Sequence, residues 1–346
     1  MRPGWRITAE ACLRSRNTFG VAAVAPWLVE VEDPEKLAEV FALPQVQAHA
    51  PLLLGGGSNL LFAGNPEGAV ITLDAHRIQI IQDHPDGATL SVDAGVQWHT
   101  LVMWTLQRGL VGLENLALIP GTTGAAPIQN IGAYGTEAGE FIQTVVAFDR
   151  ETGLLSRLAA DACGFAYRDS VFKRNPDQYI VTAVEFRLPR RHALRMDYAG
   201  IADELAAMGI SHPDAMDVAN AVIRIRRRKL PDPELIGNAG SFFKNPMVSA
   251  QLAQAVALKY PALPSFRGDA PDMRKLSAAW MIDACGWKGF REGDAGVADS
   301  HALVLVNHGQ ASGAQLLGLA RRIADSVHER FGVWLEPEPK LVGAQW

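Results

Sequence analysis

A stretch of seventeen residues, Ile119 to Gly135, carries no charged side chain and constrains the fold more than any other part of this chain. It contains four glycines, three alanines and two prolines. A solvated loop usually carries charges, whereas a loop of small residues lets its backbone lie against a bound molecule. We therefore expect this segment to form a cradle for a ligand. The alternative is a buried crossover segment without a ligand.

A second glycine-rich segment, Gly55 to Asn59, follows the apolar run Pro51 to Leu54 directly. Bare backbone N–H groups in such a loop can converge on a phosphate. A dinucleotide fingerprint of the G-x-G-x-x-G type does not fit, because its third glycine would fall on Leu60. A simple turn between two strands remains the alternative. If both segments bind ligand, one would hold a pyrophosphate and the other a planar ring.

Composition excludes several classes of protein. The chain has 346 residues, enough for two or three domains, and its 37 acidic and 32 basic residues give a net charge of −5. A net-acidic chain is a poor general nucleic-acid binder. Cys12, Cys163 and Cys285 form no CxxC pair, which argues against a disulfide framework and a zinc cluster. We interpret the nine histidines, His99 included, as structural, and we expect no metal.

No apolar run approaches the roughly 20 residues that span a bilayer, and the first residues lack the apolar core of a signal peptide. We therefore expect a cytoplasmic protein that acts without a membrane.

Strand patterns dominate the middle of the chain and helical patterns its last third, which favours α+β over a doubly wound sheet. Strands are expected at 69–73, 88–95, 143–150, 178–188 and 302–306, and helices at 34–43, 96–109, 218–229, 275–286 and 313–332. The last helix carries the clearest apolar stripe and is expected to end at Gly332. A domain boundary is expected near residues 200–216.

Four further segments carry candidate chemistry, although each has a structural alternative. Arg168, in Tyr-Arg-Asp-Ser, is a cation for a carboxylate or oxyanion, unless it forms a structural salt bridge with Asp169 or a nearby acid. Ser241 lies among glycines and aromatics, outside any G-x-S-x-G pattern, and is a candidate proton donor. The run from Arg224 to Lys229 holds five cations in six residues and suits a diphosphate, unless it is a solvated helix face. Near the C-terminus, one of the two glutamates Glu336 and Glu338 could reach into a site, unless both belong to a surface turn.

Together, these segments resemble one family, the UDP-N-acetylenolpyruvoylglucosamine reductases (UDP-N-acetylmuramate dehydrogenases). The matching strings occur in the family's order across residues 17–343: NTFG, LLLGGGSNLLF, GLENLALIPG, PIQNIGAYG, YRDSVFK, KLPDP, GNAGSFFKNP, HALVLVN and VWLEPE. Tyr198, in MDYAGI, lies where the longer form of the family has a tyrosine that covers the substrate.

The resemblance implies a vanillyl-alcohol-oxidase-type (PCMH-like) FAD-binding fold of two α+β subdomains, followed by an α+β substrate domain. We assign the first subdomain to residues 1–72, with the tail 335–346 returning to it. The second subdomain covers residues 73–215, and the sugar-nucleotide domain covers residues 216–334.

The resemblance also implies the reaction. NADPH would reduce FAD, and hydride would pass to carbon 3 of the enolpyruvyl group of UDP-N-acetylglucosamine enolpyruvate. UDP-N-acetylmuramate, a peptidoglycan precursor, would result. Ser241 matches the serine that protonates carbon 2, and Arg168 and Glu338 match the residues that stabilise the enol intermediate. Activation by a monovalent cation such as potassium is a further expectation.

The family's ligand contacts transfer to named positions of this chain. The expected FAD contacts are Gly55, Gly56, Gly57, Ser58, Asn59, Leu60, Ile119, Pro120, Gly121, Gly124, Ala125, Gln129, Asn130, Gly132 and Ala133. The expected substrate contacts are Tyr198, Lys229, Arg226 and Asn245. Ala125 and Ala126 stand where many relatives have hydroxyl side chains, so fewer side-chain contacts to the FAD phosphates are expected.

Two other functions are open at this point. One is a different FAD-dependent oxidase or dehydrogenase of the same fold. The other is a non-catalytic sugar-nucleotide-binding protein, although binding alone would not require Arg168, Ser241 and Glu338 together.

Overall fold

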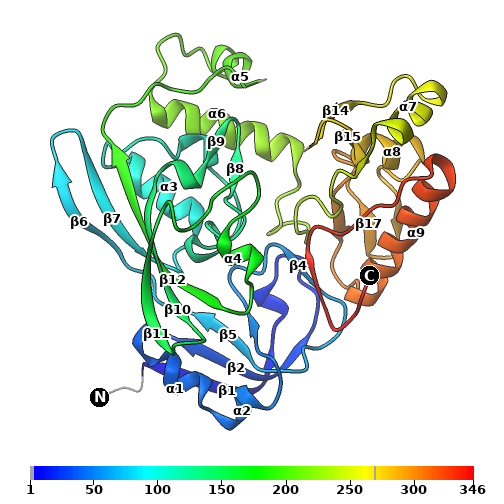
Figure 1. Ribbon diagram of the computed structural model, residues 1–346. Helices are drawn as coiled ribbons and strands as arrows, with labels where there is room; N and C mark the ends of the chain where they lie inside the picture. Colours follow the sequence, from blue (N-terminus) through cyan, green and yellow to red (C-terminus); the bar gives the residue numbers. More distant parts are fainter. Residues whose placement is uncertain (1–3, 199, 269) are drawn as a thin grey trace. The chain divides into compact units, whose positions relative to one another are not determined.

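The computed structural model describes residues 4–198, 200–268 and 270–346, and the chain divides into two compact units (Figure 1). The first unit comprises residues 1–11, 25–56 and 67–227, and the second comprises residues 12–24, 57–66 and 228–346. The expected division of the first unit into two FAD-binding subdomains stays a prediction.

An antiparallel sheet of five strands, in the order β11-β10-β12-β7-β6, forms the centre of the first unit. Its strands are β6 (Ile78–His84), β7 (Gly87–Asp93), β10 (Ile142–Asp149), β11 (Leu154–Ala159) and β12 (Tyr179–Pro189). Alternate residues of β7 and β12, such as Leu90, Val92, Val184 and Phe186, are fully buried. This period of two places them on one face of the sheet.

The helices α3 (Trp98–Leu106), α5 (Ile201–Ala207) and α6 (Ala215–Lys229) share the core of that face. Trp98 contributes the largest fully buried side chain and packs edge-on against Phe186. The sequence predicts this helix to run to Gly109; α3 itself ends at Leu106, and Gly109, with positive φ, follows shortly after.

The second sheet of the first unit has the order β1-β2-β5-β3, and β2, β5 and β3 run parallel. Its strands are β1 (Trp5–Cys12), β2 (Val24–Val31), β3 (Leu52–Leu53) and β5 (Val70–Leu73). Phe148 of β10 and Ile180 of β12 pack into the same core as β2 and β5, which joins the two sheets. The short helices beside them are η2 (Pro34–Lys36), α1 (Leu37–Phe41) and α2 (Pro44–Gln47).

Connecting segments of the first unit hold several short elements. These are η3 (Glu114–Leu116), η4 (Thr123–Ala125), β8 (Gly132–Ala133), β9 (Thr136–Glu137), η5 (Ala138–Glu140) and α4 (Val171–Arg174).

Two three-stranded antiparallel sheets and three helices make up most of the second unit. One sheet has the order β13-β15-β14, with β13 (Met247–Ser249), β14 (Ser265–Arg267) and β15 (Met273–Leu276). The other has the order β16-β17-β18, with β16 (Arg291–Glu292), β17 (Ala295–Val297) and β18 (Leu305–Asn307). The helices are α7 (Ala250–Lys259), α8 (Ala278–Ala284) and α9 (Gly313–Phe331), and η1 (Arg14–Arg16) lies in the N-terminal part of the unit.

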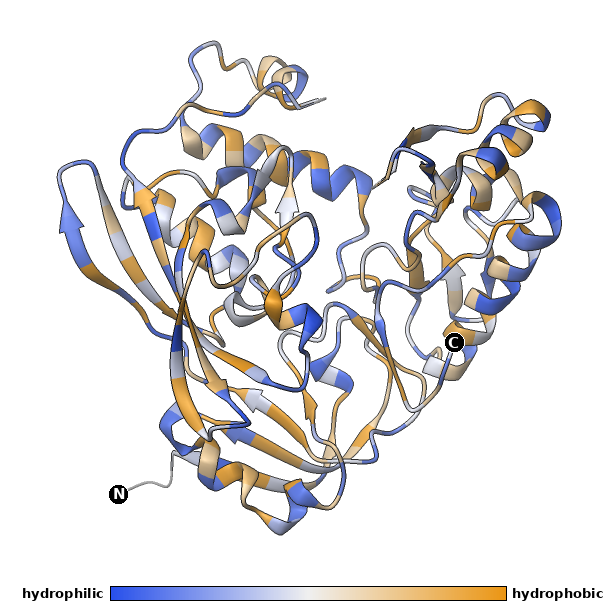
Figure 2. Cartoon of the chain, viewed as in Figure 1, coloured by the Kyte–Doolittle hydropathy of each residue, from blue (hydrophilic) through white to orange (hydrophobic). Residues whose placement is uncertain are grey.

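The expected stripe of α9, at Leu316, Ala320, Ile323, Val327 and Phe331, is buried throughout. The alternation of orange and blue along this helix is visible in Figure 2. Gly332 ends α9 in the left-handed conformation, as predicted.

The C-terminal tail pairs through β19 (Lys340–Val342) with β4 (Leu60–Phe62) in parallel register. Both strands belong to the second unit, so residues 57–66 and the tail form one structure.

Candidate active site

The two glycine-rich segments meet within the first unit. A Cβ atom added to Gly56 would lie 2.9 Å from the Cα of Gly121, and one added to Gly55 would lie 3.0 Å from the Thr122 hydroxyl oxygen. At Gly124 an added Cβ would lie 2.5 Å from the Cβ of Ala94. The neighbour is backbone at Gly56 and a side chain, that of Thr122 or Ala94, at Gly55 and Gly124, and none of the three positions has room for a side chain of its own. The two segments therefore pack closely against each other.

The remainder of the first glycine segment, from Gly57 onward, belongs to the second unit. Gly57 has φ +63°, and an added Cβ would lie 2.1 Å from the carbonyl oxygen of Arg16. Lys340 donates its N–H to the carbonyl of Asn59, so β19 continues the support of this segment.

The long segment carries unusual backbone strain. Among the described residues, five that are not glycine have positive φ, and four of these are Leu118, Asn130, Tyr134 and Arg168. The first three lie in or beside the segment, and Arg168 binds it, as shown below. Each such conformation costs about 1–3 kcal/mol and persists only where the surroundings enforce it. Strain of this kind gathers at functional sites.

The side chain of Asn130 holds the middle of the segment through three hydrogen bonds within the protein. Its Nδ2 donates to Glu137 Oε2 at 2.6 Å and to the Ala166 carbonyl at 3.1 Å, and its Oδ1 accepts from the Gly139 N–H at 2.8 Å. The residue is almost fully buried. Its side chain is therefore committed to the protein, and a contact from Asn130 to a ligand would have to use its backbone.

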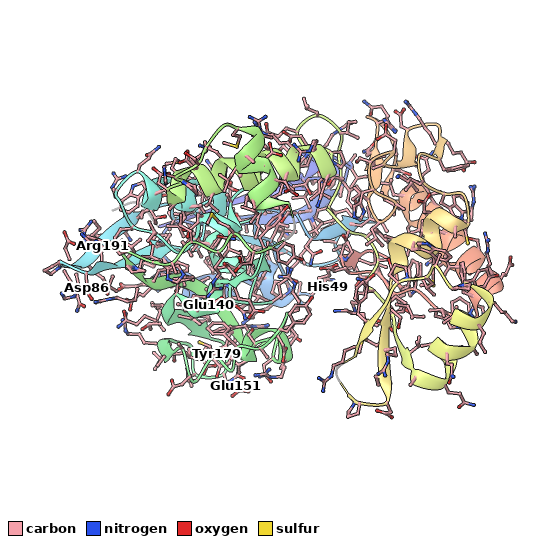
Figure 3. The ribbon with its side chains drawn as sticks, turned by 90° about the horizontal axis from the view of Figure 1, so that it is seen from above. His49, Asp86, Glu140, Glu151, Tyr179 and Arg191 are labelled. Carbon is pink, nitrogen blue, oxygen red and sulfur yellow. The ribbon has the colours of Figure 1, made fainter. Side chains whose placement is uncertain are left out.

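Asn115 and Arg195 fasten the far end. The Nδ2 of Asn115, which is buried, donates to the carbonyls of Tyr134 and Arg195, both at 2.9 Å. Arg195 donates to the Gly135 carbonyl at 2.6 Å and holds Glu140 in a bidentate pair at 2.8 and 2.5 Å. Glu140 is labelled in Figure 3. Burial by itself raises the pKa of Glu140, but the bonds from Arg195 and from the Glu137 N–H outweigh it and lower that pKa.

Arg168 projects from a tight turn in which Ala166 and Asp169 exchange two backbone hydrogen bonds. The residue adopts φ +55°, and its Nη2 donates to the Gly132 carbonyl at 2.6 Å. Lys173 Nζ donates to the carbonyl of Arg168 at 2.7 Å. Asp169 forms its ion pair with Arg174. The alternative pairing of Arg168 with Asp169 is therefore wrong, and the guanidinium lies against the glycine-rich segment.

A second guanidinium lies on the same segment. Arg226 Nε donates to the Leu118 carbonyl at 3.2 Å. Burial lowers the pKa of Arg226. Tyr134 raises this pKa and so offsets part of the decrease, whereas the charge of Arg168 lowers it further. The ring of Tyr134 packs edge-on against that of Tyr198, with centroids 5.4 Å apart, and Tyr198 is more than half exposed. The pKa of Tyr134 is raised, chiefly by burial. Of the sequence-predicted residues, Arg168 and Tyr198 thus lie at the end of this segment and Arg226 at its start, near enough to Tyr134 and Arg168 for their charges to interact.

In the second unit, Ser241 and Glu338 lie on adjacent extended segments. Phe242, next to Ser241, donates its N–H to the Leu303 carbonyl at 2.7 Å and accepts at its carbonyl from the Glu338 N–H at 2.8 Å. The Lys244 N–H donates to the Glu336 carbonyl at 3.0 Å and extends this pairing. The structure therefore brings the candidate serine and the candidate glutamate together through the backbone of one residue.

Aromatic packing fixes the serine segment. Phe242 and Phe243 are fully buried and pack edge-on with centroids 5.1 Å apart. Gly240, just before Ser241, has φ +70°. Gly237 comes so close to Phe19 that an added Cβ would lie 2.3 Å from its carbonyl oxygen.

The remaining predicted substrate residues of the second unit are Asn245 and Lys229, and both are exposed. Asn245 Oδ1 accepts from the Ala278 N–H at 3.0 Å, at the start of α8. Burial lowers the pKa of His301, and the positive charges of Lys288 and Lys229 lower it further.

Comparison with known proteins decides the family. Residues 25–158 match the FAD binding domain, and residues 232–342 match the C-terminal domain of UDP-N-acetylenolpyruvoylglucosamine reductase. The chain is 56% identical over 342 residues to the UDP-N-acetylenolpyruvoylglucosamine reductase of Xanthomonas campestris (strain B100), covering 99% of this chain and 98% of that protein. This chain belongs to the UDP-N-acetylenolpyruvoylglucosamine reductase family. The reductase of Xylella fastidiosa (strain M12) is 54% identical over 344 residues, with 99% and 98% covered.

The fold agrees with this reductase family. The crystal structure of the enzyme from Thermus caldophilus aligns with a TM-score of 0.66 at 26% identity and covers 98% of both chains. The predicted α+β fold, with an FAD-binding domain followed by a C-terminal domain, is confirmed.

The residues of the first unit fit the FAD that this reductase family uses. The contacts of Gly55, Gly56 and Gly124 leave no space for side chains, and the segment between Ile119 and Gly135 brings no charge of its own. Within the described part of the chain, no cluster of histidine, cysteine or acidic residues is suited to a metal ion. None of the helices in that part is long and apolar enough to cross a membrane.

Sequence reasoning missed the residues that support the reductase's long segment. Asn115 lies in the GLENLALIPG string, yet nothing in its spacing distinguishes a buried anchor from a surface amide. Arg195 is one of several arginines near the end of β12, and only its partners identify it. Their roles depend on contacts between distant parts of the chain, which periodicity does not reveal.

Proposed function

We propose that this chain carries out its family's reaction with Arg168, Ser241 and Glu338 as the catalytic residues. The reaction is NADPH-dependent reduction of the enolpyruvyl group of UDP-N-acetylglucosamine enolpyruvate to the lactyl group of UDP-N-acetylmuramate. The observation that best supports these roles is the pairing of Phe242 with Glu338, which fixes Ser241 and Glu338 on neighbouring strands of backbone. Two chemically different groups are thereby held at one place in the second unit.

FAD supplies the redox chemistry when bound, accepting hydride from NADPH and passing it to carbon 3 of the enolpyruvyl group. The chain's own residues deal with charge and protons. Arg168 would oppose the negative charge that develops on the enolate and the substrate carboxylate. Its turn, closed by two backbone bonds and tied to Gly132, limits the motion of the guanidinium before substrate arrives.

Ser241 would deliver the proton to carbon 2. A hydroxyl is a weak acid, so this role requires a fixed position and a polarised environment. The backbone bonds of Phe242 and the buried aromatic pair provide the fixed position. Glu338 would hydrogen-bond the enolic oxygen from the adjacent strand.

Substrate binding is assigned to Tyr198, Lys229, Arg226 and Asn245. Arg226 is the best supported of these, because it is a desolvated cation whose pKa burial has already lowered. Binding of a diphosphate would stabilise its charged form. The potassium activation, the three-part division into domains and the cytoplasmic location expected from sequence belong to this proposal as well.

The decisive experiment follows the flavin band of the purified protein without oxygen. Addition of NADPH should bleach the band, and addition of the enolpyruvyl sugar nucleotide should restore it. The Ser241→Ala variant should bleach normally and recover at least about a hundredfold more slowly, since general acid catalysis contributes about 10²–10⁴ in rate. Ser265→Ala, at an exposed serine of the same unit, is the matched control.

The outcomes separate the competing functions. Wild-type recovery in Ser241→Ala would contradict the serine's role. Bleaching without recovery in the wild type, with fast reoxidation by oxygen, would indicate a different flavin oxidase. Sugar-nucleotide binding without any NADPH oxidation would indicate a binding protein.

A further inference from the structure

The start of the glycine-rich segment, residues 116–124, is fastened to the first turn of α3. Trp98 donates its indole N–H to the Leu116 carbonyl and its backbone N–H to the Gly121 carbonyl, both at 3.0 Å. Between these two bonds, His99 Nδ1 accepts the Leu118 N–H at 3.1 Å. One turn of helix thus holds three successive points of the segment.

Leu118 is the point where the segment most needs support. Leu118 has φ +58°, in the left-handed region of backbone conformation. Leucine rarely adopts this conformation, because its bulky side chain crowds the backbone and makes no local hydrogen bond. Both of its backbone polar groups are held by side chains. The N–H goes to His99 of α3, and the carbonyl accepts from Arg226 Nε of α6 at 3.2 Å. These two side chains come from different helices and fix the orientation of both peptide planes around Leu118.

The geometry also defines the protonation state of the histidine. Nδ1 must carry no proton in order to accept the Leu118 N–H, so the ring is neutral with its proton on Nε2. The surroundings favour this state. The pKa of His99 is lowered by burial first and then by Arg227 and Arg226, both on α6. Arg226 in turn faces Tyr134 and Arg168. The charged groups that act on the ring are therefore cations, which oppose a second proton.

We propose that His99 is a positioning residue for flavin binding: by accepting the Leu118 N–H it holds Leu118 in the left-handed conformation and so aims the backbone of Ile119, Pro120 and Gly121 at the FAD. This inference rests on the proposed function, because it requires the segment to contact FAD. His99 acts through Leu118 and transfers no proton. The structural role expected of His99 from the sequence thereby takes a specific form.

A merely structural histidine would have different consequences. If His99 only filled space in the core, its loss would lower stability whatever residue stood at position 118. If it enforces the conformation of Leu118, its loss should matter much less when position 118 is glycine, which adopts positive φ without strain. The substitution Leu118→Gly therefore separates the two roles.

The experiment measures FAD affinity of the apoprotein by flavin fluorescence for His99→Ala, His99→Asn, Leu118→Gly and the double variant. His99→Ala should weaken FAD binding about tenfold and shift the absorption bands of bound flavin. His99→Asn keeps an acceptor, the Oδ1, near the position of Nδ1 and should stay within about threefold of wild type. In the Leu118→Gly background, adding His99→Ala should cost less than about threefold.

Two further readouts do not depend on enzyme activity. Hydrogen exchange of the Leu118 amide in the apoprotein should be faster in His99→Ala than in the wild type and near wild type in His99→Asn. FAD affinity of the wild type should fall once pH drops below the pKa of His99, which itself lies below the ordinary histidine value of 6.5, because protonation removes the acceptor. His99→Asn should lack that dependence.

Several results would overturn the inference. These are wild-type FAD affinity and spectrum in His99→Ala, an equal loss with leucine or glycine at position 118, or Leu118 amide exchange that ignores the substitution. Failure of the proposed function looks different, since the wild-type protein itself would then bind no FAD.

Discussion

The long glycine-rich segment of the first unit and the serine segment of the second are held in different ways. Residues 118–135 are strained, and besides backbone bonds such as those of Gly121, Thr123 and Gly124 they are tied by side-chain hydrogen bonds that involve Asn115, Asn130, Arg168, Arg195 and Arg226. Residues 237–246 are fixed mainly by backbone pairing with the segments around Leu303 and Glu336. Where the backbone of the long segment is left unpaired to face a cofactor, side chains supply the support.

The largest expected effect is at Asn130. Asn130→Ala would remove three hydrogen bonds, those to Glu137, to the Gly139 N–H and to the Ala166 carbonyl. Each bond contributes about 0.5–1.5 kcal/mol, and we expect a total loss of about 2–4 kcal/mol. Chemical denaturation of the apoprotein measures it. Asn175→Ala, which removes an exposed amide bond to Val171, is the control and should cost under about 1 kcal/mol.

The next effect tests the meeting of the two glycine segments. Gly56→Ala would place a Cβ 2.9 Å from the Cα of Gly121, where only backbone could yield. Overpacking of this kind costs about 1–3 kcal/mol, so FAD affinity should fall roughly tenfold or more. Gly318→Ala in α9, with no atom within 4 Å of its added Cβ, should leave FAD affinity unchanged and stabilise the helix slightly. Unaltered FAD binding in Gly56→Ala would mean that the segments do not share the cofactor.

A smaller, pH-dependent effect is expected at Arg195. The pKa of Glu140 is lowered in the folded protein, so its ionised form adds stability that is present above about pH 4.5 and is lost as pH falls. Arg195→Gln should remove most of this dependence. The pair is about one-third exposed, so the change is at most about 1 kcal/mol. Unfolding curves from pH 3 to pH 7, roughly the range over which a carboxyl titrates, should run flatter in the variant. A parallel shift of the two curves would contradict the assignment.

The smallest effect is expected in the serine segment. Lys244→Ala removes an exposed ion pair with Glu336 but leaves the backbone bond between the same two residues. The cost should be under about 0.5 kcal/mol. A loss comparable with that of Asn130→Ala would show that side chains support both segments alike, and the comparison would fail.

Periodic patterns predicted the larger elements well. The stripe of α9 and its terminal glycine, and the strands β7, β10 and β12, all occur where expected, because each buries a regular face. The expected strand at 302–306 is partly wrong. Its residues are buried, but β18 covers only Leu305–Asn307, since Val304 pairs through a single bridge to Ser241.

The support of the site was not predictable in the same way. Motif resemblance located Arg168, Ser241 and Glu338, but neither the strain at Leu118 nor the role of His99 follows from spacing. Both depend on which helix lies beside which loop. The assignment of residues 57–66 to the second unit likewise follows from a strand pairing across most of the chain.

That pairing has a consequence for biosynthesis. Leu60 finds its partner at Lys340, about 280 positions later, so the contact carries a large loop-closure entropy. During translation, residues 57–66 cannot form this pairing until nearly the whole chain has been synthesised. Most of the first unit has been synthesised by then. We expect the nascent chain to expose Leu60, Leu61 and Phe62, all buried in the finished fold, until Val342 has emerged from the ribosome.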